Sequence, residues 1–105
     1  MANSAKVLFR GAATTTLTTN LYTVPSATTA VVTNICVSNT ASSAGTFTLS
    51  FGASGSEVAL FDAVAIDADS TVVIDLKQVL PTTHVIDGGA SATTINFHIS
   101  GMEIA

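Results

Sequence analysis

The stretch TFTLSF, residues 46–51, alternates without exception between polar and apolar side chains. Its apolar members share one face of an extended chain; they are Phe47, Leu49 and Phe51. Its hydroxyl-bearing members share the other face; they are Thr46, Thr48 and Ser50. Successive side chains of a β-strand point to opposite faces of the sheet, so the pattern predicts a strand with one buried and one polar face.

The same period of two recurs on both sides of this stretch. Residues 71–76 and 30–39 predict two further strands, and a turn at Pro25 precedes the second. The side chains that we expect to point inward from the first are Val72, Ile74 and Leu76. Strands at such regular spacing, without helical periodicity, are typical of β-sandwiches. We therefore predict an all-β fold: a single antiparallel β-sandwich, jelly-roll-like or Ig-like, with eight or nine short strands in residues 1–105.

The last predicted strand changes its parity near its end. Three apolar side chains lie on one face; they are Ile95, Phe97 and Ile99. Met102 and Ile104 fall on the opposite face by the same count. A β-bulge at Ser100–Gly101 would return both to the core, and Gly is common at bulges. The sequence thus predicts a bulge there; a strand that passes from one sheet to the other at a corner is the alternative.

The composition is poor in charge. Only 10% of the 105 residues are charged and the net charge is −4, whereas about 25% is typical of soluble domains. The three cationic residues, Lys6, Arg10 and Lys77, are too few for the basic stripe that binds nucleic acid, so we expect no such partner. No apolar run approaches the roughly 18 residues of a membrane span, so we expect no membrane association.

No catalytic signature stands out. Ser54 lies in a Gly-rich loop without the helix that follows a nucleophile elbow. Asp67 and Asp69 have the spacing that can begin a calcium loop, but a turn followed by a strand is the simpler interpretation. Cys36 has apolar neighbours and no nearby cation to stabilise a thiolate, which favours a small buried side chain. We predict no enzyme, no metal site and no cofactor.

Three segments resemble a known group of proteins. The run LYTVPSATTAVVTNICVSNTASSAGTFTLSF, then VAIDADSTVVIDLKQVL and the closing INFHISGMEI are similar to small virion proteins of tailed bacteriophages. The matching positions are Tyr22–Pro25, Asn39–Thr40, Ala68–Ile74 and Gly101–Ile104. The resemblance implies a capsid decoration (cement) protein or a tail-associated module, with no catalytic residues to transfer.

The expected function is therefore structural. We expect a capsid decoration protein that is made in the host cytoplasm and binds the outer surface of the phage head. Its partners would be the major capsid protein, or another virion protein, and further copies of itself, with a trimer favoured. Low charge fits this role, since the core of a protein interface is depleted in charged groups. A tail, baseplate or fibre module is the first alternative.

Two regions are candidates for partner contact. Thr46, Thr48 and Ser50 form a hydroxyl-rich face that can donate hydrogen bonds without burying ions. Residues 1–10, with Lys6 and Arg10, form either an arm that reaches an acidic capsid neighbour or an ordinary first strand.

A host-surface carbohydrate-binding adhesin is a further alternative. Such a site needs exposed aromatic rings, for which Tyr22 and Phe61 are the candidates.

Overall fold

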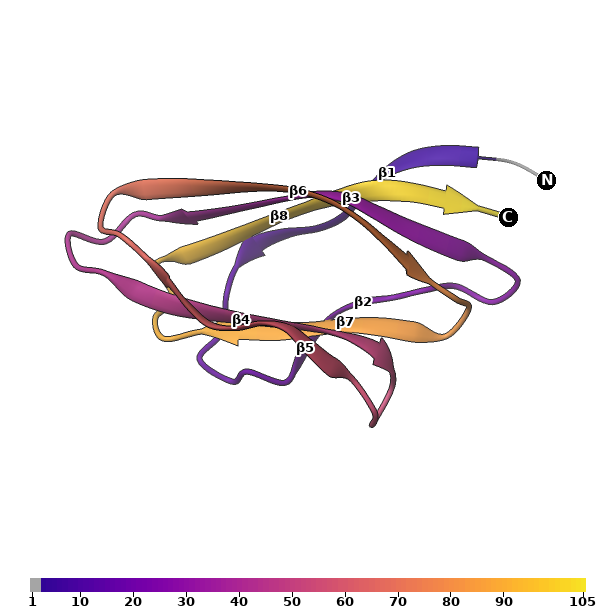
Figure 1. The fold of residues 1–105 in the computed structure, drawn as a ribbon, viewed down its shortest axis with the longest axis horizontal. Helices are drawn as coiled ribbons and strands as arrows, with labels where there is room; N and C mark the ends of the chain where they lie inside the picture. The colour runs from indigo at the N-terminus through magenta and orange to yellow at the C-terminus, as the bar shows by residue number, and fades with distance from the viewer. Residues whose placement is uncertain (1–2) are drawn as a thin grey trace.

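All regular secondary structure in a computed structural model, which describes residues 3–105, is β-strand. The strands are β1 (Asn3–Ala12), β2 (Thr19–Thr23), β3 (Thr29–Asn39), β4 (Gly45–Ala53), β5 (Val58–Ile66), β6 (Ser70–Leu80), β7 (His84–Ala90) and β8 (Ile95–Ile104). They form two antiparallel four-stranded sheets, which lie one above the other in Figure 1. The predicted all-β sandwich is confirmed, with eight strands.

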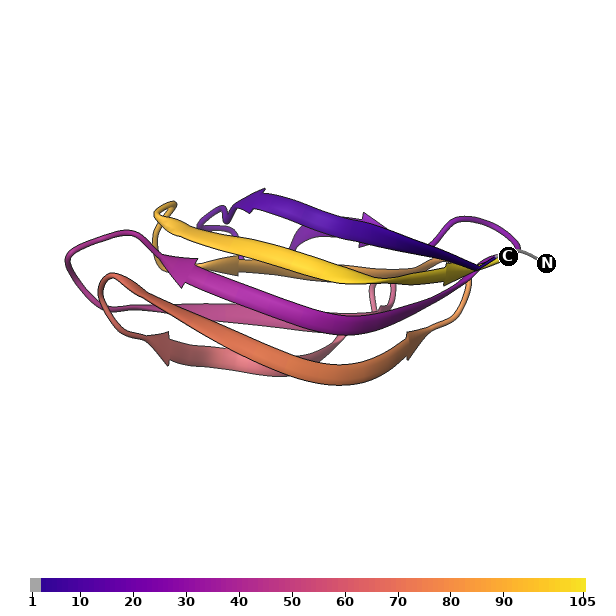
Figure 2. The same ribbon diagram turned by 90° about the horizontal axis from the view of Figure 1, so that it is seen from above.

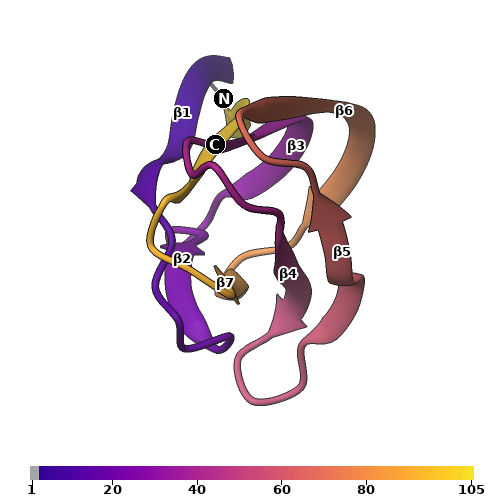
Figure 3. The same ribbon diagram turned by 90° about the vertical axis from the view of Figure 1, so that its left-hand side faces the viewer.

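The strand order is that of a jelly roll. Sheet A has the order β1-β8-β3-β6 and sheet B the order β2-β7-β4-β5. The first strand pairs with the last, the second with the seventh, the third with the sixth and the fourth with the fifth. This nesting of antiparallel pairs, with most connections crossing between two sheets, is the double Greek key of jelly rolls. Figure 2 shows the four strands of sheet A from above, and Figure 3 shows both layers end on.

The core lies between the sheets, where the inward side chains of both layers meet. Phe47, Leu49 and Phe51 point inward from β4, as the alternation predicts. The ring of Phe47 packs edge-on against Phe97 of sheet A at a centroid distance of 6.2 Å, and it lies tilted against Phe61 at 6.0 Å. The side chains predicted to point inward from β6 also pack against this core; they are Val72, Ile74 and Leu76.

The predicted bulge at Ser100–Gly101 is wrong. Strand β8 keeps its alternation to the end, and both of its neighbours carry the irregularity instead: Leu8 is the extra residue on β1, and Thr33 is the extra residue on β3. Consequently Met102 points outward and is 37% exposed.

Gly101 lies opposite both irregularities and lets β1 and β3 approach β8 closely. A Cβ at this position would lie 2.1 Å from the carbonyl oxygen of Val31 and 3.1 Å from Cδ1 of Leu8. The missing side chain gives Leu8 room to enter the core, where it is buried. Glycine is therefore needed here for close backbone approach.

The segment for which an arm or a first strand was predicted forms a strand as far as the structure describes it. Residues 3–10 lie in β1, which pairs with β8 along the edge of sheet A, and residues 1–2 lie outside the described part of the chain. Both ends of the described chain lie at the same end of the sandwich (Figure 1).

Candidate interaction surface

The outer face of sheet A, the side turned away from sheet B, carries most of the exposed apolar bulk. Of the seven large hydrophobic side chains exposed among residues 3–105, four lie on this face. They are Val7, Val73, Val79 and Met102. Strand register places Ala5, Met102, Val31 and Val79 side by side, so an apolar row crosses all four strands. We call this surface the A face.

The A face is not flat, because its surface is hollowed on both sides of the bulge at Thr33. Two open depressions flank this residue, one of about 430 Å³ and one of about 420 Å³. The first is lined by Thr33, Asp75, Leu76 and Lys77. The second is lined by Ala5, Lys6, Val7, Thr33, Ser100 and Gly101. Side chains of a second protein can enter such hollows, which a regular flat sheet would lack.

The few charges of the A face lie on its two edge strands. Arg10 is on β1, and Lys77 and Asp75 are on β6. Asp75 accepts a hydrogen bond from Nδ2 of Asn34 at 3.1 Å. All three cationic residues of the chain lie on these two strands, because Lys6 is also on β1. Charged side chains on an edge strand oppose pairing with the edge of another sheet, so the A face is suited to contact through its side chains.

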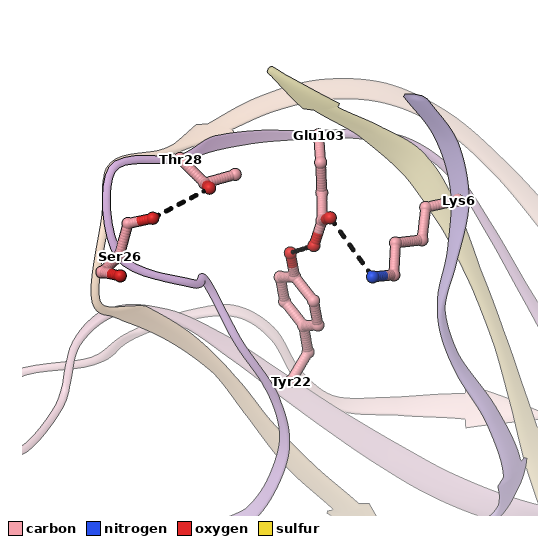
Figure 4. A network of polar contacts seen from close by, with 5 residues as sticks. All are labelled: Lys6, Tyr22, Ser26, Thr28 and Glu103. Atoms are coloured by element: carbon pink, nitrogen blue, oxygen red, sulfur yellow. Dashed lines mark hydrogen bonds and ion pairs between the residues drawn. The ribbon is translucent and has the colours of Figure 1, made fainter. Parts of the chain in front are cut away.

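Lys6 belongs to a polar network that joins the two sheets at one end of the sandwich (Figure 4). Its Nζ lies 3.2 Å from Oε1 of Glu103, and the hydroxyl of Tyr22 donates a hydrogen bond to Oε2. The hydrogen bond from Tyr22 lowers the pKa of Glu103, and Lys6 lowers it further. Burial raises the pKa of Tyr22, and Glu103 adds to this rise. Lys6, a predicted partner-contact residue, therefore already has an internal partner, whereas Arg10 lies exposed.

The predicted hydroxyl-rich face lies on the outside of sheet B and is partly used by the chain itself. Thr48 is only 8% exposed, and its hydroxyl accepts a hydrogen bond from the backbone N–H of Ala63 at 3.0 Å. The backbone of Thr46 bonds to Ser91, and Ser50 is half-buried. This face has less free hydrogen-bonding capacity than the sequence pattern suggests.

A carboxyl pair lies on the same outer side of sheet B. Asp87 of β7 is 8% exposed and accepts a hydrogen bond from Nδ2 of Asn20 at 3.3 Å. Burial raises the pKa of Asp87 to about 6, and its hydrogen bond with Glu57 and the charge of Glu57 contribute to the rise. The same hydrogen bond lowers the pKa of Glu57. The contact between the two carboxyls is therefore favourable when Asp87 is protonated, and it links the loop between β4 and β5 to β7.

The aromatic candidates for a sugar site are engaged inside the sandwich. Phe61 is half-buried against Phe47, and Tyr22 is half-buried with its hydroxyl bonded to Glu103. Neither ring is freely exposed for stacking. Cys36 is also half-buried and donates a weak hydrogen bond to Oδ1 of Asn34 at 3.3 Å, so it is less enclosed than the sequence suggests.

Sequence reasoning missed the A face, although part of the signal was present. The alternation that places Val72 and Ile74 inward also places Val73 outward, where a valine is unusual for a solvent-facing position. The position of Met102 was obscured by the false bulge at Ser100–Gly101. That β6 and β8 lie in one sheet, which gathers these side chains on one surface, follows from the topology alone.

Comparisons with known proteins add no family to this description. No protein-family model matches the sequence, and no curated protein matches it. Among residues 3–105, no group of three or more His, Cys, Asp or Glu side chains is placed to hold a metal ion. The same part of the chain contains no helix with the length and hydrophobicity of a membrane span.

Proposed function

We propose that this protein is a structural virion component: a decoration protein that binds and stabilises the head shell of a tailed bacteriophage. The observation that carries the proposal is the A face, which is broad, apolar along one row and nearly free of charge. The resemblance of the sequence to small phage virion proteins supports a location on a phage particle, and the A face supports a role in binding other proteins there.

Whether covering a surface is favourable depends on which groups lose contact with water. Covering valine and methionine side chains is favourable, at roughly 25 cal/mol per Å² of apolar area. Val73 and Val79 are 63% and 64% exposed, so both have much area left to bury. Covering ionised groups costs several kcal/mol per ion unless each is paired. The three charged side chains of the A face lie on its edge strands, where they can stay hydrated at the rim of a contact, and Asp75 already accepts a hydrogen bond from Asn34.

The size of the A face fits a protein contact. Four strands spaced about 4.8 Å apart, with about ten residues at 3.3 Å each, span a projected area of roughly 600 Å². A stable interface buries about 800 Å² on each partner. One A face therefore gives a contact of moderate strength, which the many equivalent positions on a shell would multiply.

The fold is compatible with this role and does not by itself select it. Jelly rolls occur in viral capsid proteins, lectins and cupins, and a shared fold does not imply a shared function. A tail, baseplate or fibre module would use the same kind of surface. A carbohydrate-binding adhesin is less favoured, because Tyr22 and Phe61 are both engaged within the sandwich.

The test is to locate the protein on particles and then to perturb the A face. Labelled antibody against the protein should mark heads, whereas label confined to tails would contradict the decoration role. The variant Val73→Asp should lose incorporation into particles while its far-UV circular dichroism stays unchanged, because the side chain is 63% exposed. The matched control is Leu17→Asp, which changes a 47% exposed side chain in the loop between β1 and β2. Equal incorporation of both variants would contradict the assigned surface.

A further inference from the structure

Two side chains on the outer side of sheet B are buried although neither sheet covers them there. Val85 is 3% exposed and Asp87 is 8% exposed. Register pairs them with Gly52 and Ser50, which alternate along β4 with the inward-pointing Phe51, so both face outward. Val85 is accordingly not a member of the core cluster between the sheets. A segment outside the two sheets must therefore cover them.

The loop between β4 and β5, residues 54–57, is placed to provide this cover. A Cβ on Gly52 would lie 3.2 Å from Cα of Glu57, so the loop returns directly over Gly52, the register neighbour of Val85. The side chain of Glu57 forms a hydrogen bond with Asp87. In Figure 3 this loop lies at the bottom, on the outer side of sheet B. We call residues 54–57 the flap.

The backbone of the flap can move without disturbing the sandwich. Gly55 has a φ of 86°, and a Cβ on it would meet no atom within 4 Å, so this part of the flap packs against nothing. The backbone N–H of Ser56 donates a hydrogen bond to the carbonyl of Ala53 at 2.8 Å, which lies within the turn and does not anchor it to β7. The contact of Glu57 with Asp87 is the polar link that does.

The two carboxyls of this link meet without a cation beside them. Lys6, Arg10 and Lys77 are the cationic residues of the chain, and all three lie on β1 and β6 of sheet A. His84 begins β7, but the alternation of the strand turns it to the opposite side from Asp87. Two ionised carboxylates would therefore face each other with no positive charge to offset their repulsion.

The other elements packed around Asp87 bring no further charge to it. Asn20 of β2 donates a hydrogen bond to Asp87 at 3.3 Å, and β4 contains no titratable side chain. Tyr22 of β2 is bonded to Glu103 of sheet A, and Asp62 on β5 is separated from β7 by β4. The loop between β1 and β2, which packs against β7, also contains no titratable side chain.

We propose that the flap is a pH-operated cover, closed over Val85 and Asp87 while Asp87 is protonated and open when both carboxyls are ionised. With the proton present, the Asp87 carboxylic acid donates a hydrogen bond to the Glu57 carboxylate, and a hydrogen bond to an ionised group is strong. Without it, two negative charges lie at hydrogen-bonding distance, and opening the flap separates them. The contacts that remain are those over Val85, a single valine side chain.

The position of the transition follows from the surroundings of Asp87. Burial raises the pKa of this carboxyl to about 6, and Glu57 adds to the rise. In the open flap the carboxyl is better hydrated and farther from Glu57, so its pKa falls toward the ordinary value of 3.8. Closing then takes up one proton. The ratio of closed to open flap should fall by up to about tenfold per pH unit between about pH 4 and about pH 6, and the closed form loses its advantage above that range.

Opening changes the surface on the side of the sandwich that lies away from the A face. It uncovers an apolar side chain, Val85, and a carboxylate, Asp87, where the closed flap presents small polar residues. In attachment through the A face this side is turned away from the shell, so the flap would alter what an assembled particle presents. That consequence rests on the proposed function, whereas the flap itself does not.

The test is NMR spectroscopy of the full chain at about pH 4.5 and about pH 7.5, with ¹⁵N relaxation to report backbone motion. At the lower pH we expect nuclear Overhauser contacts between the methyl groups of Val85 and the flap, with order parameters of about 0.85 for residues 54–57. At the higher pH we expect these contacts to be lost and the order parameters to fall below about 0.6. The loop of residues 91–94, which has no carboxyl, should not change. Contacts with Val85 that persist at the higher pH, or that are absent at the lower pH, would overturn the proposal.

Three variants assign the motion to the carboxyl pair. Asp87→Asn and Glu57→Gln each replace one carboxyl by an amide that can donate a hydrogen bond to the other, so the flap should stay closed at both pH values. Asp62→Asn removes a charge from the same sheet without touching the pair, and its flap should open like that of the wild type. The chemical shifts of core residues in the same spectra show whether each variant is folded. A folded amide variant whose flap still opens at the higher pH would overturn the role of the pair.

Discussion

Replacing Asp87 by Asn should make the protein's stability less dependent on pH. The side chain of Asp87 is 8% exposed on β7, and its pKa rises on folding from 3.8 to about 6. A group whose pKa is raised by folding stabilises the folded state below its unfolded pKa and loses that contribution as the pH rises through the folded pKa. The wild-type protein should therefore lose stability at this site between about pH 4 and about pH 6.

The magnitude follows from the two pKa values. The difference between 3.8 and about 6 corresponds to at most about 3 kcal/mol in the free energy of unfolding. The lowered pKa of Glu57 works in the opposite direction, because a group whose pKa is lowered by folding adds stability as the pH rises. We therefore expect the stability of the wild type, relative to Asp87→Asn, to fall by about 1–3 kcal/mol between low and neutral pH.

The assay is urea unfolding followed by far-UV circular dichroism at about pH 3.5 and about pH 8. Urea is uncharged and leaves the electrostatic interactions unscreened. The control Asp62→Asn removes one negative charge from the same sheet and matches the change in net charge. The reasoning is refuted if the difference between the wild type and Asp87→Asn is the same at both pH values.

Three further predictions concern stability. Gly101→Ala should lower the free energy of unfolding by about 1–3 kcal/mol or more, because its Cβ would clash with a backbone carbonyl. Gly11→Ala, whose Cβ would make only ordinary contacts, should be nearly neutral in the same urea titration. Equal costs for the two variants would contradict the role of Gly101. Asn39→Ala should lower the free energy of unfolding by about 1–3 kcal/mol, because this 3% exposed side chain forms hydrogen bonds to three backbone groups of two loops. An unchanged free energy in thermal or urea unfolding would show that the two loops do not depend on Asn39. Tyr22→Phe should lower the free energy of unfolding by about 1–2 kcal/mol at neutral pH, because it removes a hydrogen bond to Glu103. That hydrogen bond lowers the pKa of Glu103 in the wild type, so the cost should shrink as the pH falls below the ordinary pKa of this carboxyl. A cost that does not change with pH would contradict the network.

Local alternation in the sequence was sufficient to predict the fold class. The period of two at residues 46–51 and 71–76 reports which side chains are buried, and this signal needs no knowledge of strand order. Where the extra residue of a bulge lies on a neighbouring strand, the alternation of one strand does not reveal it. The expected bulge at Ser100–Gly101 is an example, because the extra residues, Leu8 and Thr33, lie far from Gly101 in the sequence.

The candidate surface was less predictable for the same reason. Val7, Val73 and Val79 are scattered along the chain, and only the pairing of β1, β8, β3 and β6 brings them onto one face. The polar pattern of Thr46, Thr48 and Ser50 was visible in the sequence, but the hydrogen bond between Thr48 and Ala63 depends on a bulge in β5. Side-chain pattern predicts which face a residue occupies; it does not predict what covers that face.

The most direct test of the central claim is a cryo-EM reconstruction of particles that carry this protein, at a resolution that separates β-strands. We predict eight-stranded sandwiches on the outside of the head shell, each with the outer face of sheet A buried against protein. Sandwiches found only on the tail, or an outer face of sheet A that points into solvent, would contradict the account.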